Sequence, residues 1–224
     1  MKVVLFGATG MVGQGVLREC LLDPHVEAVL TVGRSRSGTH HPKLREIVRE
    51  DLSNYTDVAA ELSGLDACFF CLGVSSMGIS EQEYERVTYG ITLAAAGLLA
   101  QLNPQMTFVY VSGAGTDSSE QGRSTWARVK GRTENALLQL PFRAAYMFRP
   151  GFIEPLHGVK SKTKAYRVLY TLAQPLLPLL RQAFPNHILT TEEVGRAMLT
   201  VARRGWTKRV LESKDIRALL QAST

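Results

Sequence analysis

The sequence predicts an α/β protein in which helices cover both faces of a doubly wound parallel sheet. Apolar runs long enough for buried strands alternate along the chain with stretches of helical apolar periodicity. A glycine-rich turn joins the first of these strands, residues 3–6, to the first helix. The 224 residues, 45% of them hydrophobic, are enough for one sizeable core. We therefore predict a single domain over residues 1–224, in which residues 150–190 contribute a small C-terminal cap.

The turn after the first strand carries three glycines in the spacing G-x-x-G-x-x-G. Gly7 lets the chain turn tightly off the strand, and Gly10 leaves room for a pyrophosphate group to approach the backbone. Gly13 lets the following helix pack against the sheet. The free N–H groups of the first helical turn, near Met11 and Val12, would then face the anion. This is the pattern of a Rossmann-type, dinucleotide-binding domain.

The second strand, residues 28–32, is followed by the basic pair Arg34 and Arg36. The carboxyl end of this strand meets the adenosine ribose in such folds, where an acidic residue would bind a free 2′-hydroxyl group. This chain offers two arginines instead, which would pair with a 2′-phosphate. The pair therefore favours NADP(H) over NAD(H), while a solvated basic loop is the simpler alternative.

The third strand, residues 44–48, leads to Asp51 and Leu52. Asp51 could accept a hydrogen bond from the adenine amino group, or it could simply be a turn or helix N-cap residue. A short helix is expected over residues 56–62.

The fourth strand, residues 66–72, contains Cys68 and Cys71 and is closed by Gly73. The odd separation sends the two thiols to opposite faces, so we predict core residues rather than a redox or metal pair. The end of this strand, with Cys71, Leu72 and Gly73, is where backbone must approach the cofactor.

The rest of the chain continues the alternation until Gly151. A segment at 160–170 is basic, and an apolar one at 171–180 is broken by prolines and is expected to cover the mouth of the pocket. The remaining expected elements are a helix capped by Ser80 and running to Leu102, a strand at 107–111, a helix at 125–140, a strand at 143–148, a helix from 190 to 204 and an edge strand at 209–211.

Composition limits the classes of function. The net charge of +6 is scattered, without a basic tract interleaved with aromatic residues, so we expect no nucleic-acid partner. We also expect no leader, no membrane span and no metal site, and three cysteines make no disulfide framework. These features predict a soluble cytoplasmic protein. Its small-molecule substrate is unknown, and a homodimer or a protein partner stays open.

Several motifs together resemble the short-chain dehydrogenase/reductase superfamily, in its atypical or extended branch. They are GATGMVG at 7–13, VSGAG at 111–115, ARVKGRTE at 127–134, RPG at 149–151, TTEEVGRAM at 190–198 and VLESKDI at 210–216. The chain looks most similar to the Tat-interacting-protein group, whose bacterial relatives are often labelled nucleoside-diphosphate-sugar epimerases.

The resemblance implies a catalytic serine at Ser112 and a lysine at Lys130 that holds the nicotinamide ribose. The usual tyrosine, four residues before the lysine, is replaced by Trp126. An indole N–H donates a hydrogen bond but shuttles no proton near neutral pH. Trp126 would either stack on a flat ligand or simply pack in the core.

The residues predicted to contact the cofactor are Gly7, Thr9, Gly10, Met11, Val12, Gly13, Arg34, Arg36, Asp51, Leu52, Cys71, Leu72, Gly73, Lys130, Arg149, Pro150 and Gly151. Three functions are consistent with this set. The first is an NADPH-dependent oxidoreductase that transfers hydride to a small or flat acceptor without the tyrosine. The second is a non-catalytic NADP(H)-binding regulator, and the third is an enzyme similar to the nucleoside-diphosphate-sugar epimerases.

Overall fold

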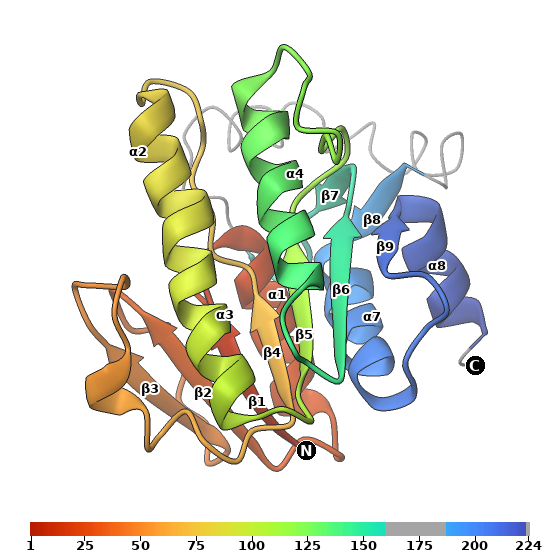
Figure 1. Cartoon of the computed structure of the whole chain (residues 1–224). Coiled ribbons are helices and arrows are strands. Elements are labelled where there is room, and N and C mark those ends of the chain that lie inside the picture. Colours follow the sequence, from red (N-terminus) through yellow and green to blue (C-terminus); the bar gives the residue numbers. More distant parts are fainter. Residues whose placement is uncertain (160–186, 223–224) are drawn as a thin grey trace.

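The computed structural model describes residues 1–159 and 187–222 of the chain. Seven parallel strands form the central sheet in the order β3-β2-β1-β4-β5-β6-β9 (Figure 1). The chain therefore starts in the middle of the sheet, winds to one edge and then to the other, which confirms the predicted doubly wound fold. The strands are β1 (Lys2–Phe6), β2 (Ala28–Gly33), β3 (Leu44–Val48), β4 (Ala67–Phe70), β5 (Thr107–Val111), β6 (Ala144–Arg149) and β9 (Val210–Glu212).

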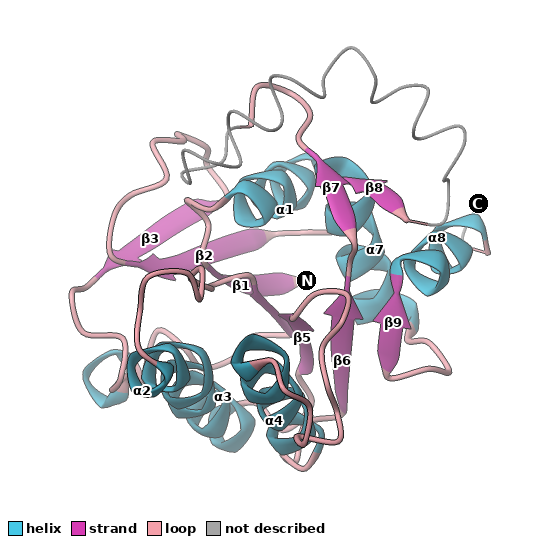
Figure 2. Ribbon diagram, turned by 90° about the horizontal axis from the view of Figure 1, so that it is seen from above, coloured by secondary structure: helices cyan, strands magenta, loops and turns pink. Residues whose placement is uncertain are grey.

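Three helices cover one face of the sheet: α1 (Met11–Leu22), α7 (Thr191–Arg204) and α8 (Ser213–Gln221) (Figure 2). α1 and α7 approach closely because each presents a glycine to the other. A Cβ atom on Gly15 would lie 2.6 Å from Thr191, and one on Gly195 would lie 2.7 Å from Glu19. A capping box between Thr190 and Glu193 starts α7.

The opposite face is covered by α2 (Glu81–Glu85), α3 (Ile91–Leu102) and α4 (Thr125–Leu138) (Figure 2). A π-helical turn, η2 (Arg86–Gly90), joins α2 to α3, so that the predicted long helix is continuous but contains an irregular turn. Its predicted cap is present, because the Ser80 hydroxyl accepts from the Glu83 N–H at 3.2 Å. Figure 1 shows this long helix running beside α4.

Some elements differ from the sequence prediction. The expected helix at 56–62 is only the 3₁₀ turn η1 (Thr56–Val58), because the N–H groups of Ala59 and Ser63 bond to carbonyls three residues earlier instead of four. A short parallel pair, β7 (Phe152–Glu154) with β8 (Ile188–Thr190), and the helix α8 were not predicted. β7 and β8 have three residues each, and no alternating apolar pattern marks them. The predicted basic and apolar segments at 160–180 lie outside the described residues.

Candidate functional site

A cleft of about 380 Å³ opens at the carboxyl ends of β1, β2 and β4. The strand order reverses between β1 and β4, and ligands of doubly wound sheets bind at this point. The predicted residues that line the cleft are Gly7, Thr9, Gly10, Met11, Val12, Arg34, Leu52, Cys71, Leu72 and Gly73. Sequence reasoning missed Ala8, Thr31, Val32, Gly33, Ser35 and Val111, although their positions at strand ends could have indicated them.

The three glycines of the turn lie where an added side chain would crowd the backbone. Gly7 has a φ of +82°, and a Cβ there would lie 2.6 Å from the backbone nitrogen of Leu72. Gly10 is the N-cap of α1, and because it has no side chain it leaves the amides of the first helical turn without a side-chain cap. Gly13 lies behind the turn, where a Cβ would come within 2.1 Å of the Gly7 carbonyl oxygen. It therefore brings the helix onto the turn instead of lining the cleft.

A second hollow of about 280 Å³ continues the cleft and shares Arg34, Leu52, Leu72 and Gly73 with it. Asp51 lines this hollow, but its carboxylate accepts from the N–H of Ser53 at 2.7 Å and from its hydroxyl at 2.6 Å. These two bonds lower the pKa of Asp51. The side chain thus fulfils the turn role that the sequence left as an alternative.

The two predicted arginines lie in different places. Arg34 lines both the cleft and the adjoining hollow, whereas Arg36 is exposed and is not among the described residues that line either one. Ser35 lines the cleft beside Arg34. The Glu46 carboxylate lies beside this loop. It accepts from the Thr31 hydroxyl at 3.2 Å and from the N–H of Ser37 at 2.8 Å.

The two cysteines of the fourth strand segment lie on opposite faces of the sheet, as predicted. Cys68 is buried in the core beneath α3, while Cys71 contacts the core on the opposite face and lines the cleft. Burial raises the pKa of the Cys71 thiol to about 12, so it stays protonated and unreactive at neutral pH.

Lys130 points from α4 to the carboxyl end of β5. Its Nζ atom donates to the Tyr110 hydroxyl at 3.0 Å and to the Val111 carbonyl at 3.3 Å. It lies 3.8 Å from where a Cβ on Gly73 would stand, which places the ammonium directly behind the cleft wall. Burial lowers the pKa of Lys130 to about 8, although Glu134 opposes this shift.

Ser112 is buried and its hydroxyl is bound within the protein. It donates to the Glu134 carboxylate at 2.5 Å, with the Phe148 carbonyl at 3.1 Å as a second acceptor. Glu134 is in turn paired with the Arg149 guanidinium, and both side chains are largely buried. Because a hydroxyl has one proton, Ser112 has none to offer to a substrate oxygen in this arrangement.

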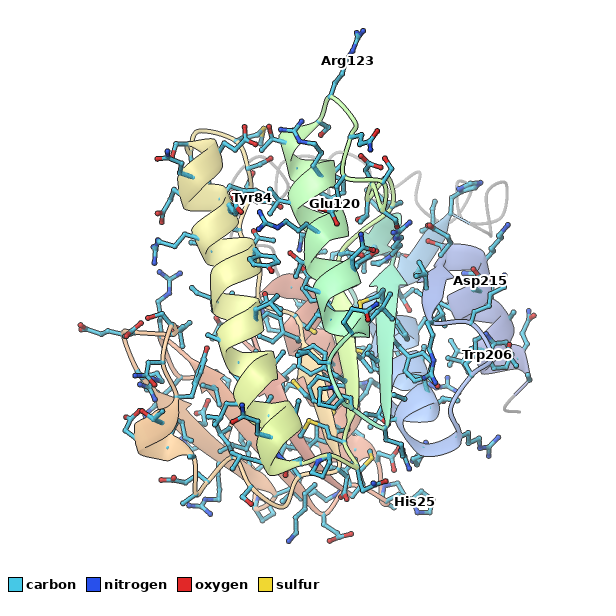
Figure 3. The ribbon with its side chains drawn as sticks, viewed as in Figure 1. His25, Tyr84, Glu120, Arg123, Trp206 and Asp215 are labelled. Atoms are coloured by element: carbon cyan, nitrogen blue, oxygen red, sulfur yellow. The ribbon has the colours of Figure 1, made fainter. Side chains whose placement is uncertain are left out.

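Trp126 packs over the turn that leaves β5. A Cβ on Gly113 would lie 3.3 Å from its ring, and one on Gly115 would lie 3.8 Å from it. Trp126 is partly buried and is not among the described residues that line the cleft. This position favours the packing role over stacking on a ligand. The loop tip before α4 extends away from the molecule at Arg123 (Figure 3).

The segment 149–151 braces the site from behind. Arg149 holds Glu134, and the Pro150 carbonyl accepts from the N–H of Ala114 at 2.9 Å. The N–H of Gly151 donates to the Ser213 hydroxyl at 2.8 Å. None of these three predicted residues is among the described residues that line the cleft, so the structure places them as supports.

The model of the "NAD dependent epimerase/dehydratase family" matches residues 3–129. The chain belongs to this family. Family members carry an NAD(P)-binding fold of the short-chain dehydrogenase/reductase type, as the motifs predicted, and solved structures with the same fold include short-chain dehydrogenases.

Two curated relatives of this epimerase/dehydratase-family chain differ in how much of it they cover. Leucinostatins biosynthesis cluster protein T from Purpureocillium lilacinum is 33% identical over 144 residues, which is 62% of this chain and 52% of that protein. Protein FMP52, mitochondrial, from Meyerozyma guilliermondii is 24% identical over 210 residues, which is 90% of this chain and 85% of that protein. The chain thus spans only about half the length of the first relative.

Among solved structures, DesIV from Streptomyces venezuelae, a dTDP-glucose 4,6-dehydratase with NAD and TYD bound, is similar to this family member at a TM-score of 0.70. The alignment covers 100% of this chain and 81% of DesIV at 14% identity, so the likeness concerns the fold.

The expected cytoplasmic location is wrong by these comparisons. The relatives that overturn it are FMP52 proteins, which are named as mitochondrial. Amino-acid composition reports on the class of fold and not on the cellular compartment, so it could not reveal this. In the described part of the chain, no helix is both long and apolar enough to cross a bilayer.

Proposed function

We propose that this protein binds NADP(H) in the cleft and acts as an oxidoreductase toward a small or flat acceptor. The observation that carries the proposal is the glycine turn, where a Cβ at Gly7 would collide with the backbone of Cys71 and Leu72 just after β4, and Gly10 leaves the amides of α1 free of a side-chain cap. These residues fit a dinucleotide: the turn would hold the pyrophosphate and Arg34 with Ser35 the 2′-phosphate of the ribose.

The bound coenzyme would supply hydride chemistry, and the protein would supply position and charge. Lys130, behind Gly73, would hold the nicotinamide ribose, because its ammonium lies at the cleft wall. With Trp126 in the tyrosine position and the Ser112 proton donated to Glu134, residues 1–159 and 187–222 offer no acid to a carbonyl oxygen. Flavins and quinones fit such a site, because solvent can supply the proton that their reduction needs.

A non-catalytic NADP(H)-binding regulator is the second candidate. The hydrogen bonds of the two expected catalytic residues favour this candidate, because both Ser112 and Lys130 are bonded to groups of the protein. An epimerase on nucleotide sugars is a third, weaker candidate despite the family name, because that chemistry would ordinarily use the missing tyrosine.

Calorimetry with NADPH and NADH tests the cofactor, with Arg34→Ala as the variant and Arg36→Ala as its matched control. We expect Arg34→Ala to lower the NADPH-to-NADH affinity ratio about ten-fold, the scale of one charge-assisted contact, and Arg36→Ala to change it little. An unchanged ratio in Arg34→Ala would refute the NADP preference.

NADPH consumption with flavins, quinones and carbonyl compounds separates the candidate functions. Turnover with a flavin or quinone supports the oxidoreductase. Tight NADPH binding without turnover of any acceptor leaves the regulator.

A further inference from the structure

The ammonium of Lys130 is held mainly by a residue of the sheet, not by its own helix. Its Nζ donates to the hydroxyl of Tyr110 at 3.0 Å, and the two residues are 5% and 0% exposed. The same Nζ atom is 4.8 Å from the centre of the Tyr110 ring, so the hydroxyl and not the ring face makes the close contact. Tyr110 comes from β5, on the sheet face that α3 and α4 cover.

The surroundings leave Tyr110 as a principal acceptor for this charge. From α4, Glu134 interacts with Lys130 electrostatically, but its carboxylate is bound to Arg149 and Ser112. The backbone of β5 adds the Val111 carbonyl at the longer distance of 3.3 Å.

α2 contributes Tyr84, which lies on the side of this helix that faces α4 (Figure 3). It interacts electrostatically with Tyr110, and its hydroxyl is buried. Tyr84 is therefore a neighbour of the pair, whereas the bond to the lysine belongs to Tyr110.

We infer that Tyr110 is a positioning residue for Lys130, whose hydroxyl fixes the ammonium behind Gly73 so that it faces the cofactor cleft. This inference rests on the proposed function, in which Lys130 contacts the bound dinucleotide. The family pattern places a tyrosine beside this lysine on α4, where this chain has Trp126. Here the tyrosine that contacts the lysine is in β5 instead.

Replacing the hydroxyl has a defined consequence. In Tyr110→Phe the ring keeps its tilted contact with Phe70 in the core, but the ammonium loses an acceptor, and the Val111 carbonyl remains as the backbone partner. A buried charge with fewer partners loses its proton more readily. Lys130 should therefore titrate at lower pH and hold an anionic ligand less well near pH 8.

Tyr146→Phe is the matched control. Tyr146 is an equally buried strand tyrosine, and its hydroxyl bonds to the backbone of Trp206 on the opposite face of the sheet. Both variants remove one bonded hydroxyl from the core, but only Tyr110→Phe touches the lysine.

The test follows the Lys130 ammonium by ¹⁵N-lysine NMR in the ligand-free protein, with Lys130→Met to identify the signal, and measures NADPH binding by calorimetry at pH 6.5 and 8. We expect Tyr110→Phe to shift the titration midpoint to lower pH and to weaken NADPH binding at pH 8 about five-fold, the equivalent of one hydrogen bond. Tyr146→Phe should match the wild type in both.

The inference would be overturned if Lys130 in Tyr110→Phe titrated at the wild-type midpoint and this variant bound NADPH as tightly as Tyr146→Phe does. If the wild type binds no NADPH, the proposed function fails instead, and the ligand-free titration still decides the role of Tyr110.

Discussion

The two halves of the candidate site differ in the groups that form them, which are backbone groups in one half and side chains in the other. The half at β1, β2 and β4 uses backbone: the glycine turn, bare helix amides and an open cleft. The half at β5, β6 and α4 uses side chains that bond to one another in the interior, from Ser112 through Glu134 to Arg149 and from Lys130 to Tyr110. The first half is open to a ligand, whereas most polar groups named in the second half are already bonded to one another. The comparison therefore supports the proposed nucleotide binding more directly than it supports any proton transfer.

The largest expected effect comes from adding one methyl group to the backbone-built half. Gly13→Ala places a Cβ 2.1 Å from the Gly7 carbonyl, so the turn must move. We expect a loss of about 3 kcal/mol or more in the free energy of unfolding and no NADPH binding, measured by urea unfolding and calorimetry. Gly97→Ala is the control, because no atom lies within 4 Å of its added Cβ, and a helix gains up to about 1 kcal/mol from the change. Wild-type NADPH affinity in Gly13→Ala would contradict the importance of this turn.

In the side-chain half, we expect the loss of the buried ion pair between Glu134 and Arg149 to reduce stability. Glu134 is 1% exposed, and Glu134→Gln leaves Arg149 without its principal charge partner and Ser112 without its acceptor carboxylate. We expect the free energy of unfolding to fall by about 3 kcal/mol in urea titrations. Glu83→Gln, which breaks the exposed pair with Arg86, should cause no measurable change. Equal losses of unfolding free energy in the two variants would show that the buried pair stabilises the fold no more than the exposed pair does.

The buried charge of Lys130 should give stability a distinct pH dependence. Burial lowers its pKa to about 8, whereas an unfolded lysine titrates near 10.4. Between these values the unfolded chain binds more protons, so the wild type gains stability as pH rises through this window. Relative to Lys130→Met, the wild type should gain about 2 kcal/mol between pH 7.5 and 9.5 in urea unfolding. A difference that is constant with pH would contradict a depressed pKa.

The smallest effect is expected from restoring the missing phenol. Trp126→Tyr reduces the packing on the Gly113 turn and should cost about 1 kcal/mol of unfolding free energy. We expect no carbonyl reduction in an NADPH assay, because Ser112 still donates its proton to Glu134. The appearance of that activity would show that the Ser112 hydroxyl is available to a substrate.

The sequence predicted the backbone half well, because glycine spacing after a strand reports directly on backbone geometry. Gly7, Gly10 and the ends of β2 and β4 lie where the motif places them. The side-chain half was harder to predict. Nothing local links Ser112 to Glu134 or Lys130 to Tyr110, since these bonds depend on how α4 is seated on the sheet. The role of Arg149 as the partner of Glu134, and the separation of Arg36 from the cleft, are tertiary facts of the same kind.

The contact between α1 and α7 has a consequence for how the protein is made. α7 begins at Thr191, and one of its arginines, Arg203, pairs with Asp23 across 180 positions of sequence. Contacts this distant in sequence form late and slow folding. During synthesis, the part of α1 that packs on α7, which includes Val16, stays uncovered until residues 191–204 have left the ribosome. A shortened product that ends before residue 190 would therefore carry the nucleotide motif and still be prone to aggregate.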